Sequence, residues 1–123
     1  MNTKPKEKKN MTQTLAMVSV EKFQSAEQLW FWFLYSRAIR NDFSHMRAAA
    51  TKRPCEILDV ETMITKLYLA GKLTDEQLNV MKKYGDRRRV PHQYIWAENR
   101  DAAKWKSAMD VLNNAAKKYG WID

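Results

Sequence analysis

Cysteine, glycine and proline are scarce in this chain of 123 residues, and each shortage excludes a class of protein. The single cysteine, Cys55, excludes an internal disulfide, so the chain does not resemble a stapled secreted domain. We therefore expect a reducing, cytoplasmic environment. Three glycines and three prolines, against many alanine, leucine, methionine, lysine and glutamate residues, favour helices over sheets.

Long hydrophobic runs are absent as well. The longest is LWFWFLY, Leu29 to Tyr35, far short of the ~20 residues that a membrane-spanning helix needs. The lysine-rich start is not followed by an apolar segment with a cleavage site, so we expect neither a signal peptide nor a membrane partner.

What the chain does contain is helical periodicity with helix-capping residues. A first helix is expected from Ser25 to about Ala50, opened by the capping pair Ser25 and Gln28. On a helical wheel one apolar stripe is predicted to face the core, consisting of Trp32, Tyr35, Ile39, Phe43, Met46 and Ala50.

Three further helices follow the proline at position 54. Asp59 is the expected N-cap of the second, and Gly71 suits its left-handed end. Thr74 and Gln77 form a capping box for the third, which Gly85 is expected to close. The last is expected from Asn99 or Asp101 up to Gly120, and the linker before it is expected to be pinned to the core by Tyr94, Ile95 and Trp96.

The sequence therefore predicts an all-α fold. Residues 13–123 are expected to form a single compact domain of four or five helices with a short αα corner at its centre, joined through Gly71. Residues 1–12 are expected to be a disordered lysine-rich arm.

Positive charge is the second feature, with a formal net charge of +8 that is distributed in blocks. Residues 1–10 carry +3, residues 37–53 carry +4 and residues 82–89 carry +4, whereas residues 54–81 carry −3. A field of this kind attracts polyanions. The candidate nucleic-acid-binding residues are Arg37, Arg40, Arg47, Lys52, Arg53, Lys83, Arg87, Arg88 and Arg89.

Arg37, Arg40 and Arg47 fall together on one face of the first helix, where arginine side chains can follow a phosphate backbone. The alternative is a solvated face balanced by acids from elsewhere in the fold. The run Arg87 to Arg89 is open to the same two interpretations.

The αα corner is compatible with a helix-turn-helix. In that motif the second helix brings its first residues to the bases, and here these are Thr74, Asp75, Glu76 and Gln77. Two carboxylates beside phosphates repel, and Gln77 is also explained by the capping box. A plain αα-hairpin is the competing interpretation.

Among the aromatic residues, Trp32 and Trp105 have core spacing, whereas Tyr94 and Trp96 lie near the arginine run and are candidates for stacking on bases. Enzyme chemistry would need Cys55, His45 and His92 to meet in a cleft. Their spacing matches no zinc site, and no phosphate-binding or dinucleotide-binding glycine pattern occurs. We expect no catalytic residues, no metal and no cofactor.

The composition and charge together predict a small, non-enzymatic DNA-binding protein of a helical-bundle type, acting as a transcription regulator or accessory factor. Double-stranded DNA is favoured over RNA as the partner. The alternative is a protein–protein interaction module, either a homodimer or an adaptor for an acidic partner, that uses the aromatic first helix.

Overall fold

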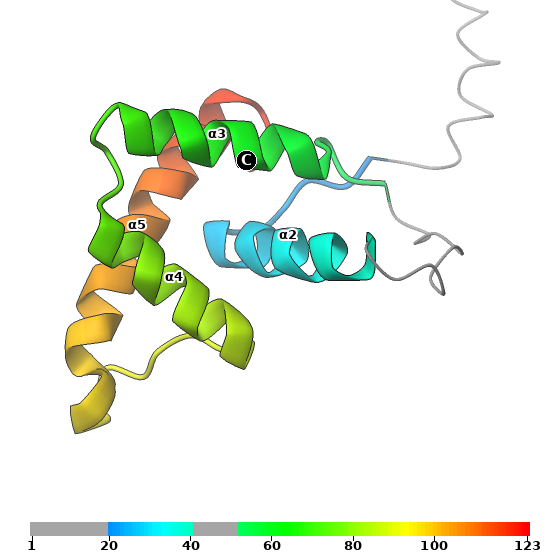
Figure 1. Ribbon diagram of the computed structural model, residues 1–123. Coiled ribbons are helices and arrows are strands. Elements are labelled where there is room, and N and C mark those ends of the chain that lie inside the picture. The colour runs from blue at the N-terminus through cyan, green and yellow to red at the C-terminus, as the bar shows by residue number, and fades with distance from the viewer. Residues whose placement is uncertain (1–19, 41–51) are drawn as a thin grey trace, which may run out of the picture.

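The computed structural model describes residues 20–40 and 52–123, and within them the protein is all-α, as the sequence predicts (Figure 1). The described elements are α2 (Ala26–Arg40), α3 (Ile57–Leu69), α4 (Asp75–Arg87), the short 3-10 helix η3 (Trp96–Glu98) and α5 (Asn99–Lys118). None of the described helices is both long and apolar enough to cross a bilayer. The predicted arm 1–12, the predicted extension of the first helix beyond Arg40, and His45 and Arg47 lie outside the described residues.

Capping residues fix several helix ends where the sequence predicts them. The Thr74 hydroxyl accepts the Gln77 N–H at 3.1 Å, and the Gln77 side chain accepts the Thr74 N–H at 2.9 Å, which completes the capping box of α4. Gly71 and Gly120 both have positive φ, at 77° and 80°. After each glycine the next N–H returns to a carbonyl five residues back, the hydrogen bond of a Schellman ending.

Two predicted boundaries are wrong. Glu56, not Asp59, is the N-cap of α3, because the Asp59 carboxylate reaches back and accepts the Glu56 N–H at 2.8 Å. Gly85 does not end α4, which continues to Arg87 and leaves Arg88 in the left-handed conformation. Position 85 requires glycine because α2 packs closely against it, and the local sequence does not show that contact.

The core forms where α2 packs against α3, α4 and α5 (Figure 1). The predicted core stripe of α2 is confirmed only in part in its described residues: Trp32, partly buried, packs against the core, whereas Tyr35 is 59% exposed and Ile39 is only partly buried. The residues of α2 that are buried are Ala26, Leu29, Trp30 and Phe33. Since the run LWFWFLY is apolar on every side, periodicity alone does not choose which side faces the core.

A close contact between α2 and α4 selects that side. The Trp30 indole N–H donates to the Met81 carbonyl oxygen of α4 at 3.0 Å. A Cβ atom at Gly85 would lie 3.1 Å from the Trp30 indole nitrogen and would clash with the Leu34 side chain. Gly85 therefore lets the two helices approach closely enough for the indole to reach the backbone of α4.

The two ends of the described chain meet beside α3. Phe23 N–H donates to the Trp121 carbonyl at 2.9 Å, and Glu21 N–H donates to the Lys52 carbonyl at 2.8 Å. The Arg53 guanidinium donates to the carbonyls of Glu21 and Lys22, and it lies over the Phe23 ring at 4.6 Å. Arg53 thus has a structural part in holding the segment before α2.

Candidate nucleic-acid interface

A buried carboxylate, Glu98, closes the loop between α4 and α5. It accepts two hydrogen bonds from the Arg89 guanidinium, one of them at 2.9 Å, and a third from the His92 backbone N–H at 2.8 Å. These hydrogen bonds, that of Arg89 above all, lower the pKa of Glu98 to about 2. We call Arg89, His92 and Glu98 the clasp. Arg89 therefore serves the fold as well as being a candidate for binding.

The Tyr84 ring, fully buried on α4, is surrounded by cations. Lys83, Arg87 and Arg89 lie 5.4, 5.2 and 5.5 Å from its centroid. The Tyr84 hydroxyl donates to Asp101 at 2.9 Å, and Lys83 donates to the same carboxylate at 2.8 Å. Much of the charge of residues 82–89 is therefore offset inside the protein, and Lys83 is turned toward α5.

Arg88 differs from its neighbours because its backbone is left-handed, with φ 59° and ψ 37°. Its N–H donates to the Gly85 carbonyl, and the next N–H donates to Tyr84, in a Schellman-type ending where glycine is usual. The exposed Arg88 side chain borders a groove between α2 and α4, opposite Tyr35 and Ala38. Within the described residues it makes no ion pair.

The other basic block lies where α2 ends and α3 begins. Arg37 pairs with Glu61 of α3 at 3.6 Å, with both side chains largely exposed, and its guanidinium lies over the Phe33 ring at 5.0 Å. Arg40 and Lys52 are exposed, and neither side chain has a polar partner among the residues that the structure describes.

Figure 1 shows that α2 and α4 end, and α3 begins, on the same side of the molecule. The Arg37–Glu61 pair links α2 to α3, and the groove at Arg88 links α2 to α4, in agreement with that view. We call this side the cationic end, formed by Arg37, Arg40, Lys52, Arg53, Arg87 and Arg88, although Arg87 also pairs with Glu98 at 4.0 Å. Four acids also lie there, so its charge is mixed: Glu56, Asp59, Glu61 and Asp86.

Tyr94 and Trp96 are 83% and 88% exposed, so the expectation that they pin the linker to the core is wrong. The linker is held by the clasp instead. The His92 ring nitrogen Nδ1 accepts the Tyr94 N–H at 3.2 Å, and the two rings meet edge to face at 5.8 Å. Both aromatic side chains are therefore exposed to solvent.

The αα connection offers little to a duplex in the docking of a helix-turn-helix. Gln77, the candidate base-reading residue, is occupied by the capping box, and its amide donates to Ser107 of α5 at 2.8 Å. Asp75 and Glu76 occupy the first turn of α4. The arginine side chains of the cationic end are the better candidates for phosphate contact.

Cys55 is buried, and burial, reinforced by Asp59 and Glu56, raises the pKa of its thiol to about 12. A thiol with so high a pKa is protonated at neutral pH and is a poor nucleophile. In the part of the chain that the structure describes, no three His, Cys, Asp or Glu residues are placed to hold a metal ion.

Sequence reasoning missed the acids that decide which cations are free. Glu98 and Asp101 lie 9 and 18 residues from their partners Arg89 and Lys83, too far apart for a helical spacing to suggest the pairs. No protein-family model matches the chain, and no match was found among curated proteins or solved structures.

Proposed function

We propose that the protein binds nucleic acid, double-stranded DNA in preference to RNA, as a small regulatory or accessory factor. The contact surface is the cationic end, with Arg40, Lys52 and Arg88 as its principal phosphate contacts. The clasp cation Arg89 and the α5-facing Lys83 contribute less, because acids of the protein already neutralise them.

The observation that carries the proposal is the backbone of Arg88. A side-chain-bearing residue in the left-handed conformation costs roughly 1–2 kcal/mol, a cost that glycine avoids. Such strain supports a functional interpretation when the side chain has no structural partner. Arg88 meets that condition within the described residues, and its planar guanidinium fits phosphate oxygens.

The helix termini at the cationic end do not themselves attract phosphate. Two of the three termini at the cationic end are carboxyl ends, whose partial negative charge repels phosphate. The amino end of α3 is already closed by its capping box, in which the Asp59 carboxylate accepts the N–H of the N-cap Glu56. The arginine and lysine side chains must therefore supply the attraction, so binding should depend on individual cations and on salt.

The test is a titration of duplex DNA at several salt concentrations. The Arg40→Gln/Arg88→Gln double variant is expected to reduce the steepness of the log–log salt dependence by about 2, since each lost phosphate contact contributes about 0.9. The control, Lys66→Gln/Lys106→Gln, removes the same charge from the end of α3 and from α5. A wild-type affinity that ignores salt, or a control that loses as much, would contradict the proposal.

A second experiment separates the strain of Arg88 from its charge. Arg88→Gly is expected to raise the free energy of unfolding by about 1 kcal/mol, because glycine relieves the left-handed backbone, and to lower DNA affinity. Arg88→Ala should lower affinity equally without the gain in stability. Unchanged affinity in both variants would show that the guanidinium contacts no phosphate.

A protein partner or a second copy of the chain is the other candidate. The aromatic residues of α2, on which that alternative rests, are buried or partly buried, apart from Tyr35. The exposed Tyr94, Ile95 and Trp96 favour it instead, because aromatic side chains on an anchored loop are typical of interface hot spots. A salt-insensitive dimer in a sizing measurement, with no DNA affinity, would favour this candidate.

A further inference from the structure

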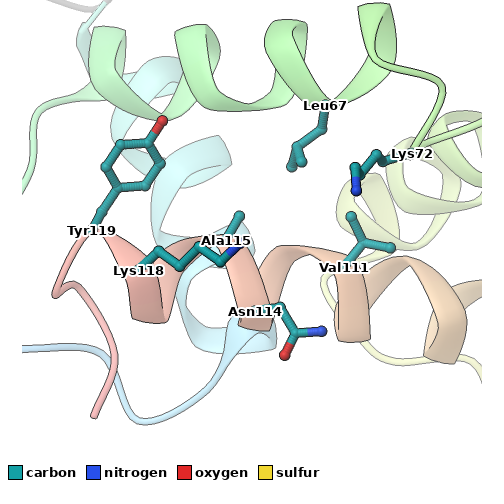
Figure 2. A pocket seen from close by; sticks show the side chains of 7 residues that line it. All are labelled: Leu67, Lys72, Val111, Asn114, Ala115, Lys118 and Tyr119. Atoms are coloured by element: carbon teal, nitrogen blue, oxygen red, sulfur yellow. The ribbon is translucent and has the colours of Figure 1, made fainter.

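A pocket of about 620 Å³ lies between α3 and α5, on a part of the molecule that the proposed function does not use (Figure 2). The volume falls within the range of about 300–1,000 Å³ that small-molecule sites occupy. Its lining comes from the end of α3 and the turn after it and from the last turns of α5: Leu67, Lys72, Val111, Asn114, Ala115, Lys118 and Tyr119.

The floor of the pocket is apolar. Leu67 reaches down from α3, and Val111 and Ala115 face it from α5 (Figure 2). All three are only partly buried and pack on the edge of the core, so apolar surface stays open to solvent between the two helices. Covering that surface with an apolar group is favourable by roughly 25 cal/mol per Å².

Figure 2 shows Lys72 and Tyr119 at opposite ends of the pocket, with Lys118 and Asn114 on the α5 side. The Lys72 backbone is fixed by its N–H bond to the Leu67 carbonyl at 2.8 Å, and the Tyr119 ring is stacked on Trp121 at 4.8 Å. One end of the pocket is therefore fixed by its backbone and the other by a stacked ring.

The charge of the lining has one sign. Both charged residues, Lys72 and Lys118, are basic, no acid is among the lining residues, and neither lysine has an ion pair within the described parts of the chain. Asp75, the acid nearest to Lys72 in the sequence, interacts instead with the Tyr68 hydroxyl and raises the pKa of that tyrosine. Asn114 and the Tyr119 hydroxyl add hydrogen-bond donors.

We propose that this pocket binds an amphipathic anion: a compact molecule whose aromatic or aliphatic body covers Leu67, Val111 and Ala115 and whose carboxylate, sulfonate or phosphate group is attracted by Lys72 and Lys118, which flank that floor from the turn after α3 and from α5 (Figure 2). An apolar floor excludes a strongly hydrated small ion as the preferred ligand, and two lysines without an ion pair among the described residues disfavour a cation. The proposal is independent of DNA binding at the cationic end.

Two fluorescent dyes of similar shape test it. Anilinonaphthalene sulfonate carries the anionic group, and phenylnaphthylamine has the same rings without it. The Lys72→Gln/Lys118→Gln variant is expected to bind the sulfonate dye about tenfold more weakly, a loss of about 1.4 kcal/mol, and to bind the neutral dye as the wild type does. Val111→Trp, which fills the floor, should abolish binding of both.

Controls locate the dye and exclude unfolding. Circular dichroism checks that Val111→Trp is folded. If that variant is unfolded, Asn114→Trp replaces it, because residue 114 is exposed and a tryptophan there fills the pocket without disturbing the core. Trp96→Ala should leave dye binding unchanged, because the exposed loop lies outside the pocket. Sulfonate binding that survives both the lysine and the filling substitutions would overturn the proposal, whereas DNA titration of the same variants reports on the cationic end alone.

Discussion

Replacing Gly85 with valine is expected to lower the free energy of unfolding by about 3 kcal/mol, the range expected for forcing extra atoms into a packed interface. A Cβ atom there would clash with the end of the Leu34 side chain and crowd the Trp30 indole nitrogen, and the two methyl groups of valine add to this crowding. The helices must separate, and the hydrogen bond from Trp30 to the Met81 carbonyl is then lost. Chemical denaturation followed by circular dichroism measures the change.

The matched control is Ala103→Val on the exposed face of α5, which adds a β-branched residue to a helix without a contact across it. It should cost only a few tenths of a kcal/mol. Gly85→Ala should cost less in a Leu34→Ala background than in the wild type, since shortening Leu34 makes room for the new methyl group. Equal costs for Gly85→Val and Ala103→Val would show that α2 and α4 do not depend on this close approach.

The same glycine shows what could be predicted from the sequence. Gly71 and Gly120 follow helical segments and lie at the helix ends that the sequence predicts, because the signal for a helix end is local. Gly85 has the same local signature but lies inside α4, buried against α2. Gly85 is needed for a close approach to α2 that lets Trp30 bond to Met81, 51 residues away along the chain, and no local pattern contains that information.

The candidate site, too, could be predicted from the sequence only in part. The all-α class and the positions of the basic blocks follow from composition and periodicity. Which cations remain free does not, because Glu98 and Asp101 reach Arg89 and Lys83 only after α4 and α5 have packed. The structure thus separates cations that hold the fold from cations that lack a partner in the described residues, and Arg88 sits between two that surround Tyr84.

Acid is expected to destabilise the protein through the clasp. The pKa of Glu98 in the folded protein is about 2, below its ordinary value of 4.5, so the ionised carboxylate stabilises the fold above pH 4.5. That contribution is lost as the pH falls from 4.5 toward 2 and protonation weakens the pairing with Arg89. Glu98→Gln, which never ionises, should melt at a lower temperature near neutral pH, and its difference from the wild type should shrink through this window.

Thermal unfolding of the two proteins across that pH range measures the difference, with Glu21→Gln as a control that removes an exposed carboxylate. A difference between Glu98→Gln and wild type that stays constant with pH would show that the Glu98 charge does not hold the loop. Because the clasp anchors the segment that carries Tyr94 and Trp96, its loss should also speed chymotryptic cleavage there. Faster cleavage at neutral pH in Glu98→Gln, and not in Glu21→Gln, would place the stabilising effect in the loop itself.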